Sequence, residues 1–110
     1  MIRIEYKNVM SEAALAANKA STAIDISLMS GYSFQCSYVD GGAFAGTIKV
    51  QGSNDGTIFT DIPSSSVAIS VANGNFFNYD GAFYRYARVF VTVTAGVAAV
   101  TIVANSKGLA

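Results

Sequence analysis

The stretch that decides the fold runs from Gly46 to Ile62 and reads Gly-Thr-Ile-Lys-Val-Gln-Gly-Ser-Asn-Asp-Gly-Thr-Ile-Phe-Thr-Asp-Ile. Before Asn54-Asp55-Gly56, apolar and polar residues alternate with a period of two, which is typical of a half-buried strand. After it, residues 57–62 again favour a strand. Asp-Gly readily takes the positive φ angles of a tight turn between antiparallel strands. The stretch therefore predicts a β-hairpin.

Similar strand patterns follow one another from residue 22 to residue 104, each bounded by turn residues. The expected strands cover residues 24–28, 32–39, 67–71, 75–79, 84–94 and 97–104, and the expected turns are Asp40-Gly41-Gly42, Asn73-Gly74, Asp80-Gly81 and Ala95-Gly96. The 84–94 strand carries large residues on both faces, so we expect it to be central and covered on both sides. Eight or nine short strands predict an all-β fold, namely an antiparallel two-sheet sandwich of jelly-roll type.

The first twenty residues read differently. Ile2 and Ile4 alternate with Arg3 and Glu5, which predicts only a short first strand. Residues 11–20 hold good helix formers behind Ser11, a candidate cap, but Leu15 supplies almost the only apolar surface. We expect residues 1–20 to form an N-terminal arm, with one short helix over residues 8–20 as the alternative. Residues 21–110 then form a single β-sandwich domain, because a chain of 110 residues can bury one core.

Composition restricts the chemistry that this chain can perform. The sequence has no histidine, so zinc sites, serine triads and imidazole acid–base catalysis are nearly excluded. The aspartates lie mostly in turns or at strand ends, and no two of them show the spacing of a hydrolytic pair. Asn54-Asp55-Gly56 lacks the further oxygen ligands of a calcium loop. We expect no enzyme, no catalytic or metal-binding residues and no cofactor.

Charge and hydropathy restrict the partners. Seven basic and seven acidic residues cancel, and the basic residues are dispersed, which argues against nucleic acid. No run approaches the ~18 apolar residues of a membrane span, and the first residues lack the apolar stretch of a signal peptide. We therefore expect a soluble product of a cytoplasm with no membrane partner. The single cysteine, Cys36, alternates with Tyr32, Phe34 and Tyr38 and should be buried.

Aromatic residues gather around Asp80-Gly81, and Phe76 and Phe77 are neighbours that must point to opposite faces of a strand. At least one of them should lie outside the core. Three interpretations stay open: core and rim packing, a subunit interface, and a sugar-stacking platform. Together with apolar residues of the arm, the candidate subunit interface comprises Ile2, Ile4, Leu15, Phe76, Phe77, Tyr79 and Phe83.

Two segments carry a family resemblance. Residues 50–59, with Ser53-Asn54-Asp55-Gly56, and residues 84–89, with Arg85-Tyr86-Ala87-Arg88, resemble the paired Ser-x-Asp-Gly and Arg-Tyr-x-Arg pattern of discoidin-type jelly rolls. Small virion structural proteins of tailed bacteriophages share this pattern, and this chain is more similar to them. It is similarly short, has an Ile24-Asp25-Ile26 strand after an Ala/Ser-rich lead, and has a polar tail containing Lys107.

The sequence departs from the discoidin pattern at Phe59, where tryptophan is common, and lacks that domain's paired cysteines. No sugar-binding or lipid-binding residue is therefore carried over. The phage resemblance implies a non-enzymatic virion protein, made in the host cytoplasm: a capsid decoration, tail or head–tail component. It would act through self-association and multivalent contact with other virion proteins, as a homo-oligomer for which we favour a trimer. The alternative is a small carbohydrate-binding module. The loops 40–45 and 63–66 hold a single aromatic residue, Phe44, which argues against a glycan partner.

Overall fold

The computed structural model describes residues 2–69, 74–80 and 84–109. The strands among these residues belong to one eight-stranded sheet, which confirms the all-β prediction. They are β1 (Ile2–Leu15), β2 (Lys19–Ala20), β3 (Ile24–Asp25), β4 (Gly31–Ser53), β5 (Thr60–Asp61), β6 (Val67–Ala68), β7 (Asn75–Tyr79) and β8 (Tyr86–Leu109). No helix in the described part of the chain is long and apolar enough to cross a membrane.

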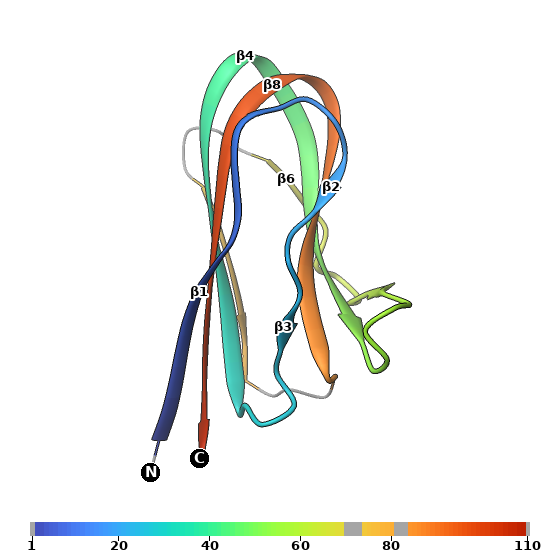
Figure 1. Ribbon diagram of the computed structural model, residues 1–110. Coiled ribbons are helices and arrows are strands. Elements are labelled where there is room, and N and C mark those ends of the chain that lie inside the picture. Colours follow the sequence, from blue (N-terminus) through green and yellow to red (C-terminus); the bar gives the residue numbers. More distant parts are fainter. Residues whose placement is uncertain (1, 70–73, 81–83, 110) are drawn as a thin grey trace.

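Two very long antiparallel strands, β4 and β8, organise the sheet. They pair along nearly their whole length, and the register slips between Asp40 and Gly46. At this level both strands curve over and descend on the other side of the molecule (Figure 1). Ala43 and Gly96 have φ angles of 47° and 70°, so the backbone departs here from extended geometry. Extra residues at such bulges bend and twist a strand without ending it.

The prediction that the chain reverses direction at Asp40-Gly41-Gly42 and at Ala95-Gly96 is therefore wrong. Both lie inside continuous strands, at the bend. The expectation of two separate jelly-roll sheets needs the same correction, because hydrogen bonding continues through the bend and the single sheet curls into a half-barrel. The described residues form eight strands, but these are not the eight or nine short ones expected, because β4 and β8 each join two of them and are 23 and 24 residues long.

The bend divides the sheet into two halves that face each other. The first half-sheet holds β1, residues 98–109 of β8, residues 31–39 of β4, and β7. The second half-sheet holds β2 and β3, residues 86–93 of β8, residues 46–53 of β4, and β5 and β6. Because β8 pairs with β1, β2, β3 and β4, the predicted central position of the 84–94 stretch is confirmed for its described strand.

The core fills the space between the halves. Phe34 and Ile102 from the first half-sheet and Ile48 and Val89 from the second have no exposed surface. These residues follow the period of two that the sequence shows, so every second side chain points inward. Cys36 is buried among them as expected, with 1% of its surface exposed, and burial raises the pKa of its thiol to about 12. The thiol is therefore unreactive in the folded protein.

The helix proposed for residues 8–20 is wrong. Residues 2–15 form strand β1, which is hydrogen-bonded along β8, and a bulge at Val9 turns both Val9 and Met10 into the core. The alanine-rich sequence favours a helix only weakly at this length. Pairing with an open strand edge, and burial of Val9, Met10 and Leu15, outweigh that preference. The division of the chain at residue 20 into an arm and a separate domain stays a prediction.

The hairpin of residues 46–62 is confirmed, with a wider loop than a two-residue turn. Gln51 and Gly52 of β4 pair with β5, and residues 54–59 connect them. Gly56 has a φ of 77°, and the backbone N–H groups of Thr57 and Ile58 donate to Asp55 Oδ1 at 2.9 Å. These bonds, with one from the Ser53 hydroxyl, lower the pKa of the Asp55 carboxyl. The other two expected turns include Asn73 and Gly81, which lie outside the described residues. Phe83, close to the second turn, also lies outside them.

Candidate interaction surface

The outer side of the first half-sheet forms one broad surface, which we call the β1–β7 face. Residues paired across antiparallel strands point to the same side of the sheet. One row across the four strands is Tyr6, Asn105, Ser33 and Asn78, and the next is Asn8, Val103, Gln35 and Phe76. Further outward side chains are Ile4, Ser37, Val39, Thr101 and Lys107.

This face combines exposed apolar groups with uncharged polar ones. Seven large hydrophobic residues are exposed in the described chain, and four of them lie here: Ile4, Tyr6, Val39 and Phe76, which are 64–76% exposed. Among the thirteen side chains that define the face, Lys107 alone carries a charge. Depletion of charge together with exposed aromatic groups characterises the centre of protein–protein interfaces. The face is thus suited to contact with another protein.

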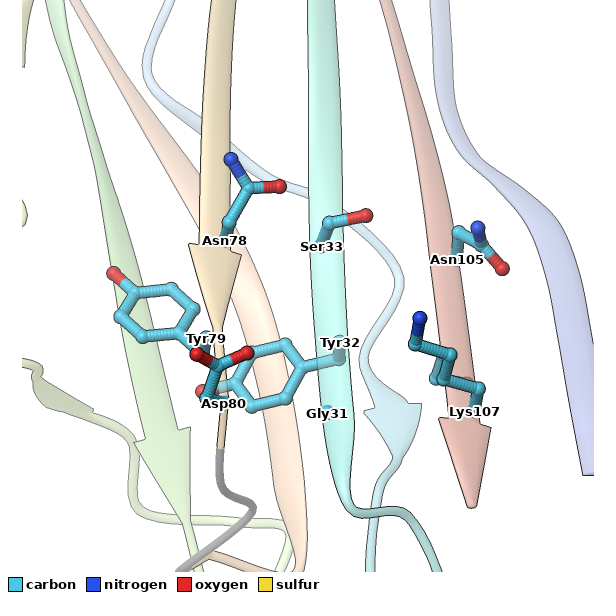
Figure 2. Close-up of a pocket in the computed structure, with 9 residues that line it drawn as sticks. Gly31, Tyr32, Ser33, Asn78, Tyr79, Asp80, Asn105 and Lys107 are labelled. Carbon is cyan, nitrogen blue, oxygen red and sulfur yellow. The ribbon is translucent and has the colours of Figure 1, made fainter.

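A shallow hollow of about 200 Å³ lies near one end of this face, between the ends of β7, β4 and β8 (Figure 2). Its lining includes Ser33, Asn78 and Asn105 from three adjacent strands. Tyr32 lies beneath, stacked on Tyr79 with ring centroids 5.0 Å apart. Burial raises the pKa of both tyrosine hydroxyls. The hollow is smaller than the roughly 300 Å³ at which pockets for organic ligands begin.

The structure separates the residues of the candidate interface. Ile4 and Phe76 are exposed on the β1–β7 face, whereas Leu15 and Phe77 lie in the core, 6% and 7% exposed. Tyr79 is half-buried against Tyr32. Phe76 and Phe77 do point to opposite faces, as the sequence indicates. Phe83 lies outside the described residues, as does the side chain of Ile2. That these residues form a subunit interface stays a prediction. Among those with described side chains, Ile4 and Phe76 are exposed at the surface.

Sequence reasoning missed Tyr6 and Val39, which are 76% and 69% exposed. The sequence pattern indicates the outward position of both. Tyr6 continues the alternation of Ile2 and Ile4 along β1. Val39 follows the inward-pointing Tyr38 and must therefore face outward. The sequence does not predict that they share a face with Phe76, since this depends on the order β1–β8–β4–β7 across the sheet.

The outer side of the second half-sheet, which we call the β3–β5 face, contains the two segments of the family resemblance. Arg88 Nε donates to Gln51 Oε1 at 2.8 Å, and Gln51 Nε2 donates to Asp61 Oδ1 at 2.9 Å. Lys49 Nζ bonds the other oxygen of Asp61 at 2.9 Å. The Arg88 guanidinium also lies 4.0 Å from the centre of the Phe59 ring. Here charged groups bind one another across strands.

Asp55 and Asp61 form their hydrogen bonds within the chain. Within residues 2–69, 74–80 and 84–109, no three His, Cys, Asp or Glu side chains are placed to share a metal ion. The pKa of Asp61 is lowered, first by the hydrogen bond from Gln51 and then by that from Lys49. A depressed carboxyl pKa suits an ion-paired structural residue rather than a general acid.

Curled single sheets of this kind occur in other proteins. No protein-family model matches this chain, and no curated protein matches it significantly. The crystal structure of the SPBc2 prophage-derived protein YomS superposes with a TM-score of 0.70 at 12% identity, over 98% of this chain and 96% of YomS. The fold is therefore shared over essentially the full length of both chains.

Two further solved structures share the fold. The PBSX exported protein XepA gives a TM-score of 0.65 at 17% identity, and the match covers 96% of this chain but 37% of XepA. A chain from Bacillus endospore appendages, which are described as disulfide-linked pili, gives 0.62 at 18% identity over 99% and 89%. At these identities the similarity establishes the fold alone. The fold thus occurs in a prophage-derived protein, in an exported protein and in an endospore appendage.

Proposed function

We propose that this protein is a non-enzymatic structural component of a phage-type particle, as a capsid decoration, tail or head–tail protein. The observation that carries the proposal is the β1–β7 face, where Ile4, Tyr6, Val39 and Phe76 are exposed amid uncharged polar groups. The fold shared with the prophage-derived protein YomS supports the same class. Such a protein acts through self-association and multivalent contact, because its affinity arises from repeated surfaces rather than from a reacting group.

The test compares substitutions on the β1–β7 face with one elsewhere. Val39→Ser and Phe76→Ser remove exposed apolar groups from the face, and Ile58→Ser removes an equally exposed one, 71%, from the loop of residues 54–59. Light scattering and sedimentation at micromolar concentration should show weaker association for the first two variants and none of this loss for the third. Melting temperatures should be alike in all three. A wild-type protein that is monomeric at every concentration would remove the self-association on which the proposal depends.

The non-enzymatic part of the proposal has its own measurement. Chelator treatment should leave the melting curve unchanged, and the purified protein should hydrolyse none of a panel of ester, peptide and glycoside substrates. A fall of several degrees in melting temperature with EDTA, reversed by calcium, would instead identify a metal site among the aspartate loops.

The carbohydrate-binding alternative has less support. A sugar platform needs an aromatic ring lying flat toward solvent beside hydrogen-bonding groups. In the hollow, Tyr79 stacks on Tyr32 rather than standing free. Tyr6 is an exposed ring in the same row as Asn105, and a Tyr6→Ala variant tested on immobilised polysaccharides would reveal glycan binding if it existed.

A further inference from the structure

The outer edge of β1 is open. Residues 2–8 pair with β8 in an uninterrupted register on one side, and no described strand pairs with them on the other. The side chains of residues 4–8 are exposed on both faces of the strand. Figure 1 shows this part of β1 running beside the end of β8, near both chain termini. An edge of this kind presents unpaired N–H and C=O groups that can accept another strand.

Natural edge strands are blunted by proline, by a bulge, or by charged side chains, especially lysine and inward-pointing charges. The bulge in β1 lies at Val9, so it leaves seven regular residues, about 24 Å of strand, before it. Residues 2–7 contain no proline and read Ile-Arg-Ile-Glu-Tyr-Lys. Glu5 and Lys7, which are opposite in charge, lie on one side of the strand. This pattern repels a uniformly charged partner and is complementary to a strand of the same sequence running the opposite way.

We propose that two copies of this chain pair edge to edge through β1, antiparallel, with a two-fold axis at Tyr6. In this register Glu5 lies opposite Lys7 of the second copy, twice, and Tyr6 lies opposite its own equivalent. Directly opposed residues have Cβ atoms about 5 Å apart, close enough for both contacts. A register centred on Glu5 would oppose the two Glu5 carboxylates and is disfavoured. The proposal rests on the proposed function, since it adds one defined contact between two copies to the association through the β1–β7 face.

The pairing also enlarges the surface offered to other proteins. In this register the outward side chains of both copies lie on the same side of the joined sheet. The β1–β7 faces of the two copies therefore become continuous across the paired β1 strands. Four strands spaced ~4.8 Å and about nine residues long span roughly 570 Å². A standard interface buries about 800 Å² on each partner. The β1–β7 face of one copy is smaller than that area, and the joined faces of two copies are larger. On the inner side, Glu5 and Lys7 line a groove of about 290 Å³ beside β3, which keeps these charges near water.

Charge reversal tests the register. Glu5→Lys and Lys7→Glu each oppose like charges at both positions, and each should raise the dimer dissociation constant about tenfold or more. The double variant Glu5→Lys/Lys7→Glu restores opposite charges and should return the constant to near the wild-type value. Sedimentation gives the constants, and melting curves confirm that all three variants are folded. Single and double variants that weaken association equally would overturn the proposed register.

Cross-linking tests the contact directly. Tyr6→Cys places a thiol on the two-fold axis, where opposed strand residues meet the distance requirement of a disulfide. Mild oxidation should convert this variant to a covalent dimer, while the control Ile58→Cys, equally exposed but on a distant loop, stays monomeric. Native Cys36 is 1% exposed and does not interfere. Self-association that persists without this cross-link overturns β1 pairing and leaves the proposed function standing. A wild-type chain that never associates overturns both.

Discussion

The two outer faces of this molecule are built from the same two strands, yet they differ in chemistry. On the β3–β5 face, Arg88, Gln51 and Asp61 bond one another, and the Phe59 ring covers the guanidinium. On the β1–β7 face, amides, hydroxyls and exposed apolar groups lie in rows, and the charged Lys107 and Asp80 lie at its margin beside the hollow. The first face satisfies its polar groups within the chain. The second leaves contacts to be made by another molecule, which distinguishes a stabilising surface from an associating one.

The family resemblance falls on the stabilising surface. Ser53 and Asp55 hold the loop of residues 54–59, and Arg88 ties β8 to β4 and stacks on Phe59. Asn54 Oδ1 accepts a hydrogen bond from the backbone N–H of Arg85 at 3.2 Å, which joins the two segments. The paired motif thus specifies how two strands are locked together. It carries information about the fold, whereas the association surface has a sequence of its own.

The largest expected effect is at the bend that separates the two faces. A Cβ on Gly96 would overlap the backbone carbonyls of Gly42 and Ala43, and the φ of 70° disfavours alanine. Gly96→Ala should therefore lower the free energy of unfolding by about 3 kcal/mol, measured by urea denaturation. Ala95→Ser, at the exposed neighbouring position, should change it by less than about 0.5 kcal/mol. Equal stabilities would mean that the strands do not bend here.

The next effect compares the faces themselves. Arg88→Ala removes the donor to the buried Gln51 carbonyl and the cation over Phe59, and should cost about 2 kcal/mol of stability. Gln35→Ala, an exposed position on the β1–β7 face, should cost less than about 0.5 kcal/mol. Thermal denaturation of both variants measures the two losses of stability. A similar loss for both would abolish the distinction between the two surfaces.

A smaller effect is expected in the loop of the β3–β5 side. Gly56 has a φ of 77°, and a Cβ there would lie 3.1 Å from the Tyr86 ring. Gly56→Val should reduce stability by more than about 1 kcal/mol, because a β-branched residue is strained at positive φ. Gly56→Asn, which tolerates this conformation, is the matched control and should lose less. The two melting temperatures should differ in that order.

The smallest effect is a pH dependence that belongs to the same side. The pKa values of Asp55 and Asp61 are lowered from 3.8 by hydrogen bonds that exist only in the folded state. Their contribution to stability is therefore complete above pH 3.8 and is lost as the pH falls through the lowered values. Asp61→Asn should flatten the acid part of a plot of melting temperature against pH. An unchanged profile would mean that the Gln51 and Lys49 contacts do not persist in solution.

Local sequence pattern by itself determined the class of fold, the hairpin of residues 46–62, the burial of Cys36 and the opposite orientations of Phe76 and Phe77. These features depend on the two-residue period of a strand and on the φ preferences of Asp-Gly. Both act between near neighbours in the chain, so they can be read without knowledge of the rest of the molecule. The absence of histidine likewise limited the chemistry without reference to any structure.

Only the tertiary structure decided whether Gly42 and Gly96 end strands or bend them, because the outcome depends on the two bulges lying opposite each other. It also extended the short strand expected at residues 2–5 through residue 15, where local preference is partly helical, since the free edge of β8 and the core supply the stabilising contacts. Finally, it brought Tyr6, Val39 and Phe76 onto one surface. Strand order sets that proximity, and strand order is fixed by pairing between residues far apart in the chain, which no local pattern encodes.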